Sequence, residues 1–392
     1  MVEEYRKLHH SVNKVPIHSM KEGMGMANIN ARDELGSVIP YPLGPPPEEI
    51  QKEQGFTRII RMGDNENPYG SSPKAREAAE KALESCSFYP DGTYSHLFSE
   101  LGRYHGLPED NFIVGNGSDE IIRLLTRAYI GKGDEAVMAD CTFPRYKTNV
   151  LIEGGQPVEV PLLHGVHDLK GMLGKISTKT KMVFVCNPNN PTGTIVKKDY
   201  LREFCEQVPE HVMIVLDEAY FEYVEQGAMT DAKVVLGQYK NAVILRTFSK
   251  IHGLAGLRIG YGMMAPEIVG ELKKVRDVFN VNRIGAAAAA ASLTDKSFLE
   301  MSAARNRIER DFVSRNLSKM GYIVLPSEAN FVFVKINEPA RQAEAALARK
   351  GIFVKGISAP GFPNALRVAL GTREENERFL EAIREFTVEG VI

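Results

Sequence analysis

The stretch KMVFVCNPNNPTGT at 181–194 decides the fold, together with HVMIVLDEAY at 211–220 and NAVILRTFSK at 241–250. Each stretch is a short apolar run, rich in β-branched residues, that ends abruptly in polar, ionisable or turn-forming residues. Such runs, separated by helical segments, are typical of a mostly parallel sheet covered by helices on both faces. In such a sheet the carboxyl ends of the strands form one edge, and ligands bind there. The three polar ends are therefore predicted to face a single site.

The pattern on either side of this stretch predicts an α/β domain followed by a smaller α+β domain. Strands and helices alternate from about 73 to 285, and an Ala-rich helical segment then leads into short strands and a closing helix. We predict a large domain over 63–284 and a small domain over 285–392. Residues 1–62 are predicted to be an arm and linker, which packs on the small domain or on a partner subunit, and YPLGPPPEE at 41–49 supports the linker.

Composition excludes several functional classes. Apolar residues make up 43% of the 392 residues and charged residues 25%, which is typical of a soluble globular protein. The formal charge of −2 gives no overall field that would hold the chain on nucleic acid or on an anionic membrane, and no apolar run approaches the length of a membrane helix. The four cysteines have no CxxC spacing and no disulfide pattern, so a reducing cytoplasm is expected and no metal site is predicted.

Asp217 and Tyr220 offer a carboxylate and a phenol at one strand end. In a site of low dielectric, a carboxylate can keep a ring nitrogen protonated, which turns an aromatic ligand into an electron sink. Turns and helix caps are the ordinary roles of polar residues after a strand. Three such strand ends together favour a ligand site instead.

Lys250 is the only lysine at these three strand ends. Desolvation there lowers the pKa of an amine, and the neutral amine can form an imine with an aldehyde. A surface lysine beside Ser249 is the ordinary alternative. Ser249 and Arg258 argue against it, because a hydroxyl and a guanidinium close to Lys250 suit a phosphate dianion.

A second wall for the same phosphate is expected at GNGSDEIIRLL, residues 115–125. Ser118 or Asp119 is predicted to cap a helix there, whose free amides and dipole attract an anion. Asn190 lies between two prolines that hold its backbone, so its amide could donate to a ring hydroxyl shared with Tyr220. Phe143 in TFPRY would supply a flat face for the ring, although core packing explains this residue equally well.

The ordered motifs closely resemble those of the fold-type I aminotransferases that depend on pyridoxal 5′-phosphate (PLP), and among these the histidinol-phosphate aminotransferase group. From about residue 40 onward the chain contains NENPYGSSP, YPDG, GNGSDE, TFPRY, NPNNPTG, DEAY, SK with GLRIGY, NFVFV and LRVALGT. The resemblance implies that Lys250 carries PLP as a Schiff base, that Asp217 contacts its pyridine nitrogen, and that Asn190 and Tyr220 contact its ring oxygen.

The resemblance also assigns the phosphate, the ring face and the assembly. It implies that Ser249, Arg258 and the backbone around Ser118 and Asp119 hold the phosphate, and that Phe143 stacks on the ring. In that family the tyrosine at the position of Tyr69 reaches the cofactor phosphate of the other subunit. A homodimer is therefore expected.

The residues at the substrate end depart from the pattern of the group. The group binds the phosphate of its amino donor through two arginines and an N-terminal tyrosine, and Arg367 and Tyr41 match one arginine and the tyrosine. Lys355 replaces the other arginine, and an ammonium lacks the two-pronged geometry of a guanidinium. Asn190 is also expected to face the substrate.

The resemblance implies transamination of histidinol phosphate with 2-oxoglutarate to imidazole acetol phosphate and glutamate, in histidine biosynthesis. An aromatic or other amino acid as the donor is an alternative, because Arg367 could hold a carboxylate equally well. A PLP-dependent decarboxylase of a phosphorylated amino acid is a second alternative on this scaffold. A non-catalytic sensor fits less well, because Lys250, Asp217 and Tyr220 are intact and no separate basic DNA-binding domain is visible.

Overall fold

The computed structural model describes residues 30–40 and 47–389. Residues 1–36 form one unit, whose described part includes most of the 3-10 helix η1 (Asp33–Ser37), and residues 37–392 form the other. The sheets, the cores and the candidate site all belong to the second unit. Within the described ranges, no helix combines the length and the apolar character that a membrane span requires.

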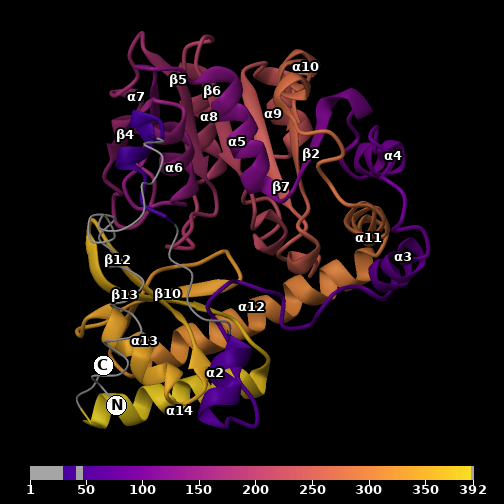
Figure 1. Ribbon diagram of the computed structural model, residues 1–392. Coiled ribbons are helices and arrows are strands. Elements are labelled where there is room, and N and C mark those ends of the chain that lie inside the picture. Colours follow the sequence, from indigo (N-terminus) through magenta and orange to yellow (C-terminus); the bar gives the residue numbers. More distant parts are fainter. Residues whose placement is uncertain (1–29, 41–46, 390–392) are drawn as a thin grey trace, which may run out of the picture. The chain divides into compact units, whose positions relative to one another are not determined.

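A seven-stranded sheet forms the centre of the larger domain (Figure 1). Its order is β2-β8-β7-β6-β5-β3-β4, and β8 alone runs antiparallel to its neighbours, which confirms the predicted mostly parallel sheet. Sequence analysis did not predict β8, whose GYGMM sequence contains two glycines and has weak strand propensity. The strands are β2 (Phe112–Gly115), β3 (Glu135–Ala139), β4 (Gln156–Val160), β5 (Thr180–Cys186), β6 (Met213–Asp217), β7 (Ala242–Thr247) and β8 (Gly260–Met264).

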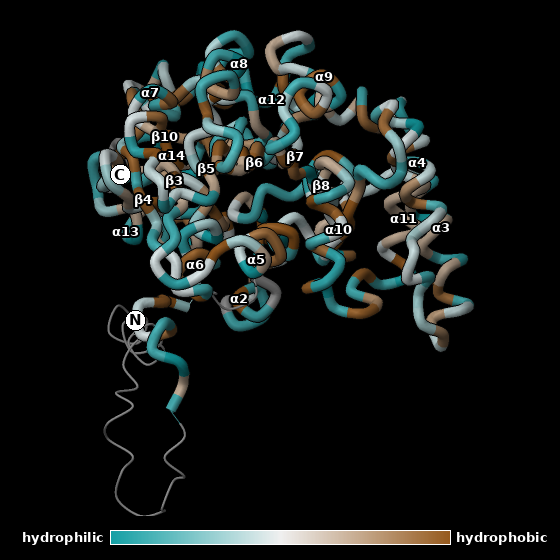
Figure 2. The backbone as a smooth tube through the Cα atoms, turned by 90° about the horizontal axis from the view of Figure 1, so that it is seen from above, coloured by the Kyte–Doolittle hydropathy of each residue, from teal (hydrophilic) through white to brown (hydrophobic). Residues whose placement is uncertain are grey.

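Helices cover both faces of this sheet. Strand side chains alternate between two cores, so that on β6 Ile214 and Leu216 pack on one face and Val215 on the other. Figure 2 shows hydrophobic residues along β6 and β7, and a largely hydrophilic α8 outside them. One face carries α5 (Ser118–Tyr129), α6 (Arg145–Ile152) and α10 (Pro266–Val275); the other carries α3 (Pro73–Leu83), α4 (Ser95–His105), α7 (Leu169–Leu173), α8 (Lys198–Gln207), α9 (Ala232–Gln238) and α11 (Arg283–Leu293).

The smaller domain is an antiparallel sheet with helices packed against its core (Figure 1). The sheet order is β12-β13-β10-β9, and a separate parallel pair joins β1 to β11. Its strands are β1 (Ile60–Arg61), β9 (Ile323–Val324), β10 (Phe331–Lys335), β11 (Ile352–Phe353), β12 (Lys355–Ala359) and β13 (Phe362–Ala369). Its helices are α12 (Lys296–Lys319), α13 (Ala340–Ala348) and α14 (Arg373–Glu389).

Short elements complete the described chain. They are α2 (Pro47–Gln54), η2 (Glu109–Asn111), η3 (Phe221–Tyr223) and η4 (Ala255–Leu257). Helix α11 begins two residues before the predicted start of the small domain at 285. It packs against α3 and α4 and adds Ala288, Ala289 and Ala290 to the core of the larger domain. The predicted boundaries at 62/63 and 284/285 remain a proposal.

Candidate active site

Five parallel strands end at the same edge of the large sheet, and the predicted residues follow them. Asp217 is the last residue of β6, and Lys250 follows β7 by three residues. Asn190 follows β5, Phe143 follows β3, and Ser118 follows β2. The fold therefore brings these residues to one edge, as the sequence predicted.

Asp217 is buried and held in one orientation. Its Oδ2 accepts a hydrogen bond of 2.6 Å from the Tyr146 hydroxyl, and its Oδ1 accepts one of 3.2 Å from the Ala219 amide. The Tyr146 ring lies nearly parallel to Phe184, with their centroids 4.7 Å apart. Burial raises the pKa of Asp217 to about 6, and the hydrogen bond from Tyr146 opposes that rise. The carboxylate is therefore predominantly ionised at neutral pH.

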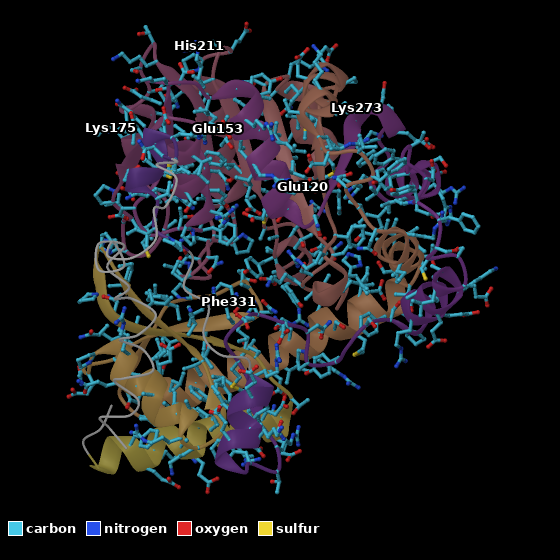
Figure 3. The ribbon with its side chains drawn as sticks, in the orientation of Figure 1. Glu120, Glu153, Lys175, His211, Lys273 and Phe331 are labelled. Carbon is cyan, nitrogen blue, oxygen red and sulfur yellow. The ribbon has the colours of Figure 1, made fainter. Side chains whose placement is uncertain are left out.

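Tyr220 follows Asp217 by three residues and is also buried. Its hydroxyl accepts a hydrogen bond of 3.0 Å from Asn65 Nδ2. Its ring meets that of Phe331, labelled on β10 in Figure 3, edge to face at a centroid distance of 5.2 Å. Burial raises the pKa of Tyr220 well above its usual value, so the phenol keeps its proton.

The Lys250 ammonium lies close to these two residues. Its Nζ donates a hydrogen bond of 2.9 Å to the Asp64 carbonyl oxygen and lies 5.8 Å from the centroid of the Tyr220 ring. Burial lowers the pKa of Lys250 to about 8, and the nearby Arg367 charge lowers it further, while Asp64 acts in the opposite sense. A large part of this amine is therefore neutral, and nucleophilic, near pH 8.

Ser249, Arg258 and the start of α5 form a cluster of donors. Arg258 Nη1 lies 3.5 Å from Ser249 Oγ. A Cβ atom at Gly117 would lie 2.7 Å from Arg258 Nη2, so only glycine lets the guanidinium come this close to the helix. The amides of the first helical turn have no acceptor within the helix. Together these groups form a cradle suited to a dianion.

The cap of α5 differs from the prediction. Neither Ser118 nor Asp119 caps the helix; Gly117 occupies the cap position, with φ of 80°, and no side chain caps the amides. A side-chain cap would occupy the amides that an anion needs. The Asp119 carboxylate instead accepts hydrogen bonds of 2.9 and 3.2 Å from Arg145 Nε.

Arg367 of β13 occupies the small-domain side of the site. Its Nη1 donates a hydrogen bond of 2.7 Å to Asn190 Oδ1, and its Nη2 donates to the Gly63 carbonyl oxygen. Lys355 lies directly opposite Arg367 on the neighbouring strand β12. Residues paired in this way point to the same face of an antiparallel sheet. Two cationic side chains are therefore placed next to each other beside Asn190.

Three predicted residues need separate mention. The Phe143 ring contacts that of Tyr146 edge to face, at a centroid distance of 5.6 Å, and Tyr146 in turn donates a hydrogen bond to Asp217. Tyr69 packs against α12, where the Arg305 guanidinium lies 5.1 Å from the centroid of its ring. Tyr41 falls outside the described residues.

Known proteins are similar to this chain in both sequence and architecture. The sequence profile of the family described as aminotransferase class I and II matches residues 57–383. The chain belongs to this family. A histidinol-phosphate aminotransferase of Moorella thermoacetica is 43% identical over 90% of this chain and 92% of its own length, and one of Brevibacillus brevis is 41% identical over 88% and 95%. These relatives confirm the resemblance to that group.

A solved structure places the aminotransferase in its fold class. The histidinol-phosphate aminotransferase of Sinorhizobium meliloti, determined in complex with PLP, matches with a TM-score of 0.85 and 28% identity. The match covers 92% of this chain and 99% of that one. The predicted fold-type I architecture is therefore confirmed.

The aminotransferase has contacts that sequence analysis missed. Tyr146 and Asn65 both hydrogen-bond to predicted site residues, and the Gly63 and Asp64 carbonyl groups hold Arg367 and Lys250. Tyr146 belongs to the quoted TFPRY motif, which could have indicated it. Asn65 lies in the quoted NENPYGSSP motif, but its role was not predicted; Gly63 and Asp64 gave no signal, because backbone carbonyl groups leave no mark in a sequence.

Proposed function

We propose that this aminotransferase transfers the amino group of histidinol phosphate to 2-oxoglutarate, with PLP as its cofactor, in histidine biosynthesis. The products would be imidazole acetol phosphate and glutamate. The relatives named histidinol-phosphate aminotransferase, 43% and 41% identical over about nine tenths of the chain, support the substrate. The placement of Lys250, Asp217 and Tyr220 at one sheet edge supports transamination as the reaction type.

The described residues fit PLP. The cradle of Ser249, Arg258 and the α5 amides is uncapped and lined by Gly117, as a phosphate requires. Asp217 is a buried carboxylate whose two oxygens have only neutral donors, Tyr146 and a backbone amide, so its charge is left to a cationic partner. The Tyr220 hydroxyl keeps a proton to donate.

Each residue would then have a defined task. When bound, PLP supplies an electron sink that stabilises negative charge on the substrate carbon. Asp217 would keep the pyridine nitrogen protonated, Tyr220 and Asn190 would hold the ring oxygen, and Phe143 would cover one ring face. Lys250 Nζ would bind the cofactor. Once the donor amine has taken its place, the free Lys250 amine would remove the proton from the substrate carbon that bears the amino group.

The substrate anion would bind to Arg367. Its Nη1 already bonds to Asn190, which would align the substrate with the ring. Lys355, opposite Arg367 on β12, would add a second positive charge toward a phosphate. Tyr41 would complete this end of the site.

A homodimer is part of the proposal, with Tyr69 reaching the neighbouring site. Large apolar side chains are exposed in two loops: Phe88 and Tyr89 between α3 and α4, and Val278 after α10. The Tyr89 ring stacks on Phe279 at 4.8 Å, so the two loops form one surface. Exposed apolar patches of this kind mark protein interfaces. The three buried free thiols, Cys141, Cys186 and Cys205, suit the cytoplasmic location that we also propose.

Subunit mixing tests the dimer and the role of Tyr69. We expect Lys250→Ala and Tyr69→Ala to be inactive or weak alone, whereas a mixed dimer has one site with both native residues. Random reassociation of equal amounts should restore about a quarter of wild-type activity. No restoration, or a monomer in analytical ultracentrifugation, would contradict this part of the proposal.

A half-reaction screen tests the substrate. The PLP-loaded enzyme is mixed with histidinol phosphate, phenylalanine, tyrosine or histidine, and the change in cofactor absorbance is followed without 2-oxoglutarate. Histidinol phosphate should react at least about tenfold faster than the others, because its phosphate can bind to both Arg367 and Lys355. A phosphorylated amino acid is added as a fifth donor, because histidinol phosphate has no carboxyl group to lose; release of carbon dioxide from it without a keto-acid requirement would instead identify a decarboxylase.

An aromatic amino acid is the second candidate for the donor. Lys355 favours it, because a point charge recognises a phosphate less specifically than a second arginine does. In that case phenylalanine or tyrosine would react fastest in the same screen. Arg367 would then hold their carboxylate.

A further inference from the structure

Asn65 is the most constrained residue of the segment that crosses the site between β1 and α3. It is 1% exposed, and its φ of 56° lies in the left-handed region. This conformation is costly for a residue with a side chain, although asparagine tolerates it best after glycine. Strain of this kind persists where surrounding contacts hold it, often at functional sites.

The contacts of Asn65 fix its amide. The Nδ2 atom donates to the Tyr220 hydroxyl at 3.0 Å, and the backbone oxygen accepts a hydrogen bond of 2.9 Å from Asn330 Nδ2. Among the described residues, Oδ1 is buried and has no partner. A flipped amide would leave both N–H donors of Nδ2 unpaired instead of one acceptor, so donation to Tyr220 is the favoured orientation.

Donation from Asn65 determines what the Tyr220 hydroxyl can do. A phenol has one proton, and an acceptor lone pair of Tyr220 is taken by Asn65. The proton therefore remains available for a third group. We propose that Asn65 is a positioning residue that directs the Tyr220 hydroxyl proton toward the ring oxygen of PLP. This inference rests on the proposed function.

The neighbours of Asn65 support this assignment. Gly63 and Asp64 each accept a hydrogen bond from a site cation, Arg367 and Lys250, so three consecutive residues contact three site side chains. The segment is tied to the small domain, because the Met62 amide donates to the Phe353 carbonyl oxygen. The residues just before Asn65 are thus held in place while its amide donates to Tyr220.

The test follows the absorbance of bound PLP against pH. A hydrogen bond donated to an anionic ring oxygen stabilises the deprotonated form of the cofactor linkage and lowers the midpoint of the titration. The titratable groups around Tyr220 are Lys250, Asp217, Cys186, Arg367 and Tyr223. They are the same in all Asn65 variants, so a shift reports Asn65 itself.

Two variants of Asn65 separate hydrogen bonding from packing. Asn65→Asp keeps the shape but accepts the Tyr220 proton and adds a negative charge; its midpoint should rise by about one pH unit or more. Asn65→Gly tolerates the positive φ and removes the amide without adding charge. Its midpoint should rise by less, and its dissociation constant for PLP should increase roughly fivefold to tenfold.

Two controls complete the design. Asn330→Ala removes the side-chain hydrogen bonds to the Asn65 and Glu66 carbonyl oxygens but leaves the Asn65 amide in place, and it should leave the midpoint unchanged. In a Tyr220→Phe background, Asn65→Gly should add no further shift. An Asn65→Gly protein that binds PLP with the wild-type midpoint would overturn the inference. A wild-type protein that binds no PLP would instead overturn the proposed function.

Discussion

The two ends of the site are built in different ways. The end around Lys250 and Asp217 comes from the carboxyl ends of parallel strands in one sheet, and its carboxylate is buried. The end around Arg367 and Lys355 comes from two antiparallel strands of the other domain and reaches the first end through Asn190. The first end would perform the chemistry, and the second would select the substrate.

This difference explains why the reaction is easier to assign than the substrate. At the first end each residue type has a narrow chemical role, because an amine beside a buried carboxylate and a buried phenol suits one kind of aromatic ligand. At the second end a cation accepts any anion of suitable size. Variants at the two ends should therefore fail in different steps, and five predictions test this separation.

The largest effect is expected from Lys250→Ala. Removal of the amine should lower kcat by at least about a thousandfold, because the binding group and the proton carrier are lost together. Lys240→Ala, at an exposed lysine, is the matched control and should retain wild-type turnover. Substantial activity of the Lys250 variant in a coupled glutamate assay would contradict the assignment.

The next largest effect is expected from Asp217→Asn. The amide cannot keep the pyridine nitrogen protonated, so kcat should fall about a hundredfold while the KM of the donor changes little. Asp311→Asn, at an exposed aspartate, controls for the chemical change. An effect on KM alone would contradict this role, because it would mean that Asp217 acts in substrate binding and not in the chemistry.

A smaller effect, on binding, is expected from Arg367→Lys. Loss of the guanidinium fork should lower kcat/KM for the donor about thirtyfold, mainly through KM, and leave the dissociation constant of PLP unchanged. Lys355→Arg should act in the opposite direction and increase the preference for a phosphorylated donor severalfold. Equal losses with phosphorylated and carboxylated donors would argue against a phosphate site.

The sequence predicted the first end of the site and only part of the second. Strand periodicity placed Asp217 and Lys250 at one edge, since each apolar run ends where the polar residues begin. The pairing of Lys355 with Arg367 depends on the register of β12 against β13, which no short motif encodes. Strand β8 and the cap of α5 were missed because glycine carries no side-chain signal, although it permits the close approach of Arg258 at Gly117.

Tyr146→Phe should have a moderate effect confined to the first end. Loss of its hydrogen bond removes a group that opposes the raised pKa of Asp217, so the pKa of that carboxyl should rise further. We expect kcat to fall about tenfold below pH 7 and to recover partly as the pH increases and Asp217 ionises. A uniform loss at every pH would indicate a purely structural role.

The smallest effect is expected on the pH dependence of PLP uptake, which residues at both ends of the site should influence. Lys250, with a pKa of about 8, gains its neutral form as the pH rises through that value, so the rate of PLP uptake by the cofactor-free protein should increase over the same range. Arg367→Met removes a positive neighbour, and the midpoint should move to higher pH. Stopped-flow absorbance measures both; an unchanged midpoint would mean that the two ends do not interact.

Covalent mapping of the cofactor tests the central claim most directly. The protein is loaded with PLP, the linkage is made permanent by hydride reduction, and the peptides are analysed by mass spectrometry. The account predicts one pyridoxyl group per chain, attached to Lys250 Nζ. An unmodified Lys250, or a label that persists on another lysine in the Lys250→Ala variant, would contradict it.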